Sequence, residues 1–266
     1  MSHESEGRSV ELEIPLDVPA SVVWRALTDA EELRRWFPAD ARVEPGEGGS
    51  IWYSWGPGME GTSRIQIWEP DARLRLVERW GEGDSAVEFA MDFFITALSG
   101  ERATLRLVHS GFGSDASWDE QYTAMETGWT YFFRALKHYL ERHLGVPRVL
   151  VWERRLAGVT RDASWRLMLS LLGGHVPAPS AKVTIDVGTG PQQAVVEVLV
   201  ESRALALRLP DLDDSMLFLE FESGAEQWHC GVWLSTFGVP DETVALLRPG
   251  IQSIATQLCE GVLAGT

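Results

Sequence analysis

The sequence predicts an α+β fold made of two domains, each with a curved antiparallel sheet and a long C-terminal helix. Three observations lead to this prediction. Short alternating segments separated by turn residues fill residues 50–110, which indicates consecutive antiparallel strands. A long amphipathic helix follows at residues 118–144. After a Gly-Val-Pro linker at 145–147, similar local sequences recur in the same order.

The chain begins with a segment that is typical of a half-buried strand. Residues 9–16 alternate apolar and polar side chains, and Pro15 favours a sheet edge or a bulge. Residues 20–37 predict two short helices, with Thr28 or Asp29 capping the second. Because these helices are too short to form a core alone, we expect them to pack on other elements as a clasp.

Five further segments, at 50–55, 62–69, 72–80, 86–98 and 102–110, predict strands joined by turns. A parallel connection needs a crossover of about a dozen residues, so these short connections make neighbouring strands antiparallel. One face of such a sheet is dry and the other is wet. The residues expected on the dry face are Ile65, Ile67, Leu74, Leu76, Val87, Phe89, Met91, Phe93, Ile95, Leu105 and Leu107.

The helix at 118–144 is expected to close the dry face. Asp115 or Ser117 suits its N-cap, and Gly145 followed by Pro147 ends it. Apolar side chains recur every three or four residues, which places them on one face of the helix. These side chains are Trp118, Tyr122, Met125, Trp129, Phe132, Leu136 and Leu140.

The second half of the chain repeats features of the first half. The matching pieces are a strand at 149–156, a helix start at 162–166, apolar segments at 204–209 and 217–221, a Ser-Thr-Phe-Gly strand end at 235–238, and Gly250 with Leu258. We therefore predict domains at 1–146 and 147–266, the second being a diverged and shortened copy. The alternative is an unrelated β-rich domain closed by a helix at 241–263, in which Pro249 predicts a break or kink.

Composition restricts the partners and the location of the protein. The 266 residues carry a formal net charge of −16, which repels phosphate backbones and anionic lipid, so no nucleic acid and no membrane are expected as partners. No run approaches the ~18 apolar residues of a membrane span, and the polar start is unlike a signal peptide. Cys230 and Cys259 form no motif and fit reduced thiols. We expect a cytoplasmic protein.

Four local sequences resemble one known family. They are VVWRALTDAEELRRWF at 22–37, Gly48-Gly49 before a strand, TLRLVHSGF at 104–112 and Gly128-Trp129 in the long helix. With the order of elements they resemble the SRPBCC superfamily, the helix-grip fold of START and pollen-allergen-like proteins. Within it they resemble the family related to the C-terminal domain of the heat-shock-protein-90 ATPase activator. The resemblance implies a helix-grip fold with a cavity between sheet and helix that holds a small apolar or amphipathic molecule. It does not fix one activity, because members include lipid carriers, aromatic polyketide cyclases and stress-response proteins. A full co-chaperone role is not implied, and contact with a chaperone is kept as an alternative.

The helix pattern and the resemblance together indicate a candidate ligand site in the first domain. The residues expected to line it are Trp36, Tyr53, Trp55, Glu78, Phe93, His109, Trp118, Tyr122, Met125 and Trp129. An aromatic lining with a few polar groups is typical of small-molecule sites. The alternative is that these side chains only fill the core. The strand phase near residues 52–55 also leaves open that Trp52 points inward instead.

His109 and Glu78 are the polar members of this set. His109 shares the strand phase of Leu105 and Leu107, so it points to the dry face, where it suits a hydrogen bond to a ligand or a role as general base. Glu78 has the same inward phase on its own strand and needs a partner there. The alternatives are a structural histidine bonded to the backbone or a tyrosine, and a solvated Glu78.

No catalytic residue, cofactor or metal is predicted. The six histidines lack metal spacing, and Cys-x-x-Cys, G-x-S-x-G, P-loop and dinucleotide-binding motifs are absent from the sequence. We therefore favour a protein that binds a small hydrophobic or aromatic ligand in the first domain and is not an enzyme. The alternatives are a cyclase-like or hydratase-like enzyme that uses His109 as acid or base, and a chaperone-interacting protein.

Overall fold

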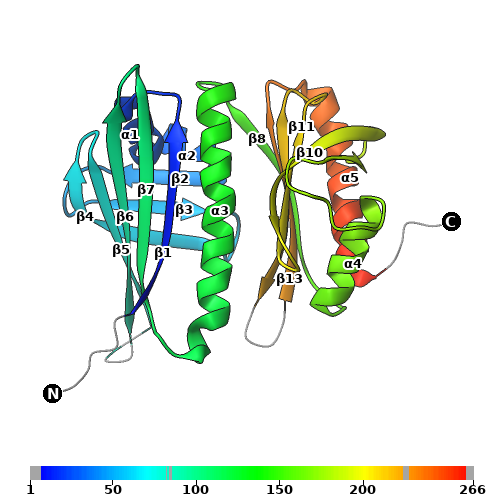
Figure 1. The fold of residues 1–266 in the computed structure, drawn as a ribbon, viewed down its shortest axis with the longest axis horizontal. Coiled ribbons are helices and arrows are strands. Elements are labelled where there is room, and N and C mark those ends of the chain that lie inside the picture. The colour runs from blue at the N-terminus through cyan, green and yellow to red at the C-terminus, as the bar shows by residue number, and fades with distance from the viewer. Residues whose placement is uncertain (1–6, 82, 84–85, 224–227, 262–266) are drawn as a thin grey trace. The chain divides into compact units, whose positions relative to one another are not determined.

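The computed structural model describes residues 7–81, 83, 86–223 and 228–261. The chain divides into two compact units, Met1–Gly145 and Val146–Thr266, and each is described by itself. Each unit combines one antiparallel sheet with a long helix at its C-terminal end (Figure 1). The predicted α+β fold of two helix-grip domains is therefore confirmed.

The first unit contains seven strands and three α-helices in its described residues. They are β1 (Arg8–Leu16), α1 (Ala20–Thr28), α2 (Ala30–Arg34), β2 (Asp40–Glu44), β3 (Ser50–Ser54), β4 (Glu60–Glu69), β5 (Arg73–Trp80), β6 (Val87–Leu98), β7 (Arg102–Phe112) and α3 (Asp119–Arg142). The sequence analysis did not predict strand β2. Its five residues include only two apolar side chains, Ala41 and Val43, which are too few to show an alternating pattern.

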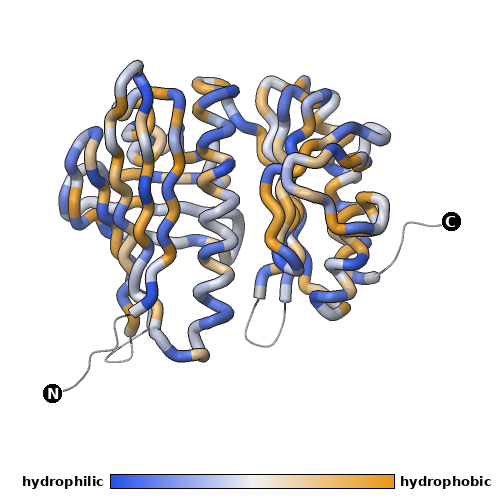
Figure 2. The backbone as a smooth tube through the Cα atoms, viewed as in Figure 1, coloured by the Kyte–Doolittle hydropathy of each residue, from blue (hydrophilic) through white to orange (hydrophobic). Residues whose placement is uncertain are grey.

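The strands of the first sheet are ordered β1-β7-β6-β5-β4-β3-β2, and each neighbouring pair is antiparallel. Consecutive strands from β2 to β7 are therefore hairpin neighbours. Strand β1 instead pairs with β7, where Val10 faces His109 and Leu12 faces Leu107. Blue and orange segments alternate along these strands in Figure 2, as expected for a sheet with one polar and one apolar face.

A bulge in β4 changes which side chains face the core. Ile65 pairs with Leu76, but Ile67 pairs with Arg75, so the register shifts by one residue between them. Trp68, opposite Leu74, takes the inward position and meets the ring of Trp24 of α1 at 5.0 Å between centroids. The prediction that Ile67 lies on the dry face is wrong, because the extra residue of a bulge reverses the alternation that follows it.

The two short helices form the predicted clasp. Helix α1 lies against β6 and β7, and Val23 and Leu27 on it are buried. The side chain of Asp29 accepts hydrogen bonds from the backbone N–H groups of Glu31 and Glu32, which caps α2 and sets the bend between the helices. Of the two cap residues considered, Asp29 is the one that the structure uses.

Helix α3 covers the inner face of the sheet unevenly. A 3-10 turn at Ala116–Trp118, capped by Asp115, leads into it. No side chain from Asp119 to Glu126 is buried, whereas Trp129, Leu136 and Leu140 are. The second half of α3 therefore forms ordinary core, and the first half leaves its apolar side chains partly accessible.

The second unit repeats this topology with fewer elements in its described residues. They are β8 (Arg148–Leu156), α4 (Arg161–Leu171), β9 (Lys182–Asp186), β10 (Pro191–Val200), β11 (Ala204–Leu209), β12 (Ser215–Ser223), β13 (Trp228–Phe237) and α5 (Asp241–Glu260). The strand order is β8-β13-β12-β11-β10-β9, so again the first strand lies beside the last. In its described residues the second unit has one α-helix and one strand fewer than the first unit.

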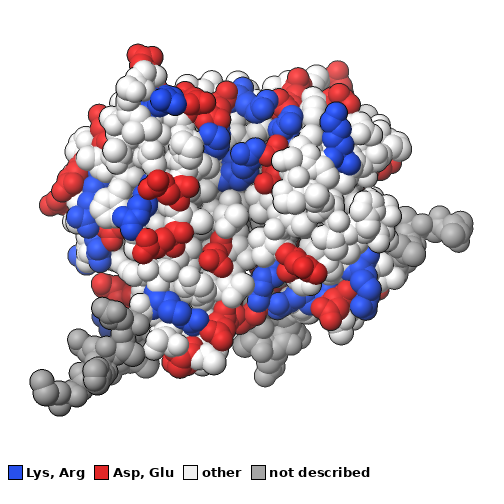
Figure 3. All heavy atoms as spheres, in the orientation of Figure 1, with Lys and Arg blue, Asp and Glu red and all other residues white. Residues whose placement is uncertain are grey.

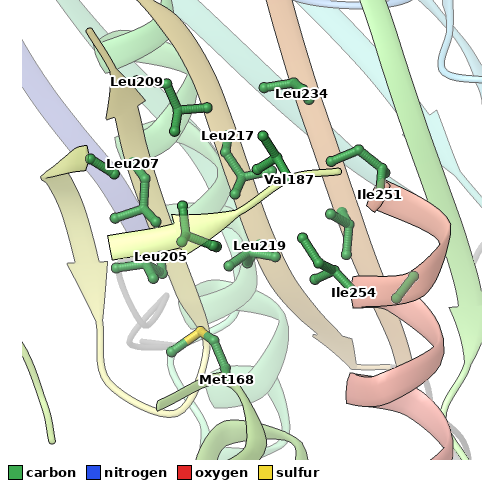
Figure 4. Close-up of a cluster of buried hydrophobic side chains, with 14 of the residues drawn as sticks. Met168, Val187, Leu205, Leu207, Leu209, Leu217, Leu219, Leu234, Ile251 and Ile254 are labelled. Carbon is green, nitrogen blue, oxygen red and sulfur yellow. The ribbon is translucent and has the colours of Figure 1, made fainter. Parts of the chain in front are cut away.

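The core of the second unit is built mainly from aliphatic side chains between the sheet and α5 (Figure 4). Helix α5 continues through Pro249, so of the predicted break or kink the break does not occur. Leu247 and Ile251, on either side of the proline, are both fully buried, and this packing offsets the missing backbone hydrogen bond. The predicted helix end at residue 263 lies outside the described residues.

Acidic and basic side chains are mixed over the face drawn in Figure 3. On the outer face of the first sheet, Arg73 and Arg75 approach the buried carboxylate of Asp92 to 2.8 and 2.6 Å.

None of the helices in the described ranges combines the length and the apolar character that crossing a membrane requires.

Candidate functional site

His109 lies near the end of β7, on the face that α3 covers. Its side chain is buried, with a relative exposure of 4%. The rings of Phe89, Phe112 and Trp129 surround it, with centroids 5.9, 5.1 and 6.2 Å from that of the imidazole. The indole Nε1 of Trp129 donates a hydrogen bond of 2.9 Å to His109 Nδ1. Strand β7 and helix α3 together therefore fix the position of the imidazole.

The hydrogen bond from Trp129 determines which nitrogen of His109 carries the proton. Because Nδ1 accepts, the neutral ring must hold its proton on Nε2. The Nε2 atom is buried and has no hydrogen-bond partner among the described residues. The ring thus presents one N–H donor to its surroundings, and its only lone pair is already engaged.

The protonation state of His109 follows from its burial. Removal from water penalises the charged imidazolium, and this lowers the pKa of His109 to about 4. The ring is therefore neutral at pH 7, which agrees with its role as an acceptor from Trp129.

Phe37, directly after the clasp, is the centre of an aromatic cluster. Its ring stacks on Trp129 at an interplanar angle of 12° and a centroid distance of 5.7 Å. The other rings in contact with it include those of Tyr53, Trp55 and Phe132, with centroids between 4.7 and 5.9 Å away. Phe93 meets the ring of Trp129 at 5.7 Å. The cluster therefore brings together four predicted site residues: Tyr53, Trp55, Phe93 and Trp129.

Glu78 has its own set of partners on the inner face of the sheet. Tyr53 Oη donates a short hydrogen bond to Oε1, Ser63 Oγ donates to the same oxygen at 2.5 Å, and Trp80 Nε1 donates to Oε2 at 3.1 Å. Burial and the nearby charge of Glu78 raise the pKa of Tyr53, so its hydroxyl remains protonated. The carboxylate is thus held by three donors on three strands.

His109 and Glu78 do not form a pair. Glu78 faces Phe89 across β5 and β6, whereas His109 faces Met91 across β6 and β7. Two strand spacings and two residue steps separate them, which corresponds to about 12 Å between their Cα atoms. An acid/base pair of these two side chains would require direct contact, and this arrangement does not provide it.

The predicted residues at the start of α3, and in the 3-10 turn before it, contact two of the aromatic rings that surround His109. They are Trp118, Tyr122 and Met125, which pack half-buried against the small cluster of Val10, Phe89 and Phe112. Tyr122 meets Phe112 at 5.6 Å between centroids, and Phe112 in turn meets His109. These contacts continue the aromatic surroundings of His109 toward solvent.

Trp36 differs from the other predicted site residues. It is 2% exposed, and its Nε1 donates a hydrogen bond of 2.8 Å to the carbonyl oxygen of Ala26. This contact ties the end of α2 to α1. Trp36 also stacks on Phe37 at 5.2 Å, so it supports the aromatic cluster from behind.

The sequence analysis did not place Phe37, Ser63, Phe89, Phe112 and Phe132 in the site. Ser63 and Phe89 share the inward strand phase of predicted neighbours, and Phe132 follows Trp129 by three residues on α3, so periodicity offered a signal for these three. Phe37 lies outside any regular element, and no periodicity predicts its contacts.

The corresponding positions in the second unit are aliphatic. Where the first unit has His109 and Trp129, the matching local sequences of the second unit have Leu234 and Ile251. Both side chains are fully buried in the aliphatic cluster that Figure 4 shows. The polar contact at the centre of the candidate site is therefore replaced by hydrocarbon packing in the second unit.

Within the part of the chain that the structure describes, no three His, Cys, Asp or Glu side chains come together in a way that suits a metal ion.

The chain is similar to several proteins of known structure. Solved structures similar to this chain include a protein of Mesorhizobium loti, with 24% identity and a TM-score of 0.46 over 51% of this chain and 98% of that one. They include the di-domain ARO/CYC BexL of the BE-7585A biosynthetic pathway, with 16% identity and a TM-score of 0.46 over 96% and 94%. An Aha1 dimer of Colwellia psychrerythraea has 17% identity and a TM-score of 0.46 over 52% and 99%. No curated protein matches the sequence.

A family model identifies the first unit. The model described as "Activator of Hsp90 ATPase homolog 1-like protein" matches residues 17–141. This match begins just before α1 and ends within the last turn of α3, so it spans nearly the whole unit. The N-terminal unit of this chain therefore belongs to the family of activator of Hsp90 ATPase homolog 1-like proteins, which are of the SRPBCC type.

Proposed function

We propose that the N-terminal unit binds a small hydrophobic or aromatic molecule between its sheet and the first half of α3. One observation carries this proposal: buried His109 is surrounded by aromatic rings that continue to the half-buried side chains of Trp118, Tyr122 and Met125. Small-molecule sites are usually apolar surfaces with a few directed polar groups. Because these apolar side chains are only partly buried, such a molecule could contact them from solvent and bury their exposed surface.

The geometry supports binding in preference to acid/base catalysis by His109. A general base needs a free lone pair within reach of the substrate proton. The lone pair of His109 accepts the hydrogen bond from Trp129, and the pKa of about 4 makes the ring a weak base. Glu78 is about 12 Å away and is itself held by three donors. We therefore propose a binding role for these residues.

The proposal is tested by titrating the full chain with the neutral fluorescent probe N-phenyl-1-naphthylamine. We expect saturable binding at one site, with energy transfer from tryptophan to the probe. Met125→Trp enlarges a half-buried side chain at the proposed entrance, so we expect it to weaken probe binding by about tenfold or more, or about 1.4 kcal/mol.

The matched control is Leu246→Trp on α5, where the side chain is 59% exposed. This variant adds the same indole to an exposed position of the second unit, which contributes no residue to the proposed site, and we expect it to bind the probe like the wild type. Absence of saturable binding, or equal effects of the two substitutions, would contradict the proposed function.

A further inference from the structure

The Nε2 atom of His109 is a buried polar group that has no hydrogen-bond partner among the described residues. Leaving a buried N–H without an acceptor costs about 1–3 kcal/mol. Native structures leave few such groups unpaired, so each one calls for an explanation. The hydrogen bond from Trp129 makes this atom a donor, and a donor of this kind requires an acceptor.

The surroundings of His109 explain why the protein itself supplies no acceptor. The rings packed on it belong to Phe89, Phe112 and Trp129, and they present carbon atoms or, in the case of Trp129, a donor. The strand backbones beside it, at Val10 and Met91, belong to the β1–β7 and β6–β7 ladders. The acceptor must therefore be brought in by another molecule.

The chemistry around Nε2 also restricts what that acceptor is. A group that only donates, such as an ammonium, would meet another donor. A carboxylate or phosphate would lose its hydration for a single neutral N–H, and a buried charge without a counter-charge is costly. The neutral imidazole supplies no counter-charge, and the inward-facing carboxylate of Glu78 adds negative charge on the same face. A neutral oxygen acceptor satisfies all these conditions.

We infer that the ligand of the first unit carries a neutral carbonyl oxygen on an aromatic frame, and that His109 Nε2–H donates a hydrogen bond to this oxygen. The inference rests on the proposed function, because it names the polar group of the ligand that this site would hold. Trp129 acts as a positioning residue: by donating to Nδ1, it keeps the proton on Nε2 and directs it toward the ligand. The aromatic rings around His109 provide stacking surfaces for the frame.

A pair of probes that differ only in the carbonyl tests the inference. Fluorene and 9-fluorenone have nearly the same size and ring system, and each can displace N-phenyl-1-naphthylamine from the full chain. We expect wild-type protein to prefer 9-fluorenone about tenfold, which corresponds to about 1.4 kcal/mol for one hydrogen bond. His109→Phe keeps an aromatic ring without the donor, so the preference should vanish while fluorene still binds.

Two further variants separate the role of the donor from general damage. His109→Gln retains an N–H donor on a side chain of similar reach, and it should keep part of the preference. His175→Phe removes an exposed histidine of the second unit and should leave both affinities unchanged. If His109→Phe fails to fold, 15N NMR of the wild-type histidines provides the same test. The Nε2–H tautomer should be seen at pH 7, and its resonance should move with 9-fluorenone and not with fluorene.

The outcomes distinguish this inference from the function on which it rests. If neither probe binds, the proposed function fails and the inference fails with it. If both bind equally to the wild type, the ligand site stands and the inference is overturned, with water then satisfying Nε2. A preference that persists in His109→Phe would assign the hydrogen bond to a different donor and would also overturn it.

Discussion

At the scale of single residues, the contact between Trp129 and His109 joins two elements that are distant in the chain. Strand phase alone indicates that His109 points inward, because Leu105 and Leu107 precede it in alternation. The tautomer depends on an indole twenty residues later, on α3. The chemistry of the imidazole is therefore a property of the assembled unit, although its direction is a property of the strand.

The pH dependence of stability is expected to report the burial of His109. The native pKa of about 4 lies below the ordinary value of 6.5, so as the pH falls from 6.5 to 4 the unfolded chain takes up a proton that the native chain does not. The free energy of unfolding therefore decreases as the pH falls through this window. Between pH 7 and pH 5 we expect the loss from this one group to be about 2 kcal/mol.

Urea unfolding of the full chain at both pH values measures this loss. His109→Gln has no titrating side chain at this position, so the wild type should lose about 2 kcal/mol more than the variant between pH 7 and pH 5. Equal losses would show that His109 titrates alike in the native and unfolded states.

At the scale of secondary-structure elements, periodicity predicted the strands well and their irregularities poorly. The alternation in β5, β6 and β7 is long enough to set both the strand and its face. The bulge in β4 leaves no such sign, because Ile65 and Ile67 continue the alternation through it. Strand β2 has too few apolar residues to show a pattern. These features are decided by pairing with neighbouring strands, which single-strand periodicity does not contain.

The same limit applies to the candidate site. The inward faces of the strands and of α3 could be predicted, because each follows from the spacing of apolar residues in one element. The partners of Glu78 come from β3, β4 and β5, and the contacts of Phe37 come from a segment without regular structure. Such convergence of several elements depends on the tertiary fold.

Two glycines that match in sequence are expected to respond oppositely to alanine. Gly128 lies within α3, and a Cβ there would meet no atom within 4 Å beyond its chain neighbours and the backbone of its own helix. Gly250 lies within α5, and a Cβ there would come within 2.1 Å of the carbonyl oxygen of Val187. Gly128→Ala should stabilise the protein by about 0.5–1 kcal/mol, because glycine weakens a helix interior. Gly250→Ala should destabilise it by about 1–3 kcal/mol, because the backbone must move to relieve the overlap.

Thermal unfolding of both variants at one pH checks this pair. A destabilising Gly128→Ala would mean that space beside α3 is filled, and a neutral Gly250→Ala would mean that α5 moves away from Val187 at little cost.

At the scale of the whole molecule, each unit has its own core and its own groups whose reaction or binding can be measured. Both cysteines belong to the second unit, where Cys230 is 1% and Cys259 is 0% exposed. All residues of the candidate site belong to the first unit. Thiol reactivity and probe binding therefore follow the two units separately.

This separation leads to a prediction for Gly250→Ala. Both thiols should react slowly with an aromatic disulfide reagent in the native wild type, because the reagent reaches them only when the second unit opens. The substitution should accelerate the reaction and leave the affinity for N-phenyl-1-naphthylamine unchanged. A parallel loss of probe affinity would show that the first unit depends on the second for its binding conformation.

The placement of β1 beside β7 has a consequence for synthesis of the protein on the ribosome. Val10 emerges early, yet its partner His109 follows only after most of the first unit has been translated. At about 5–20 residues per second, the nascent β1 waits about 5–20 s before its partner leaves the exit tunnel. Glu11, Glu13 and Pro15 fall within this strand, and charges and proline are residues that discourage pairing with other chains. The order of the strands thus makes closure of the first sheet a late step in the synthesis of the first unit.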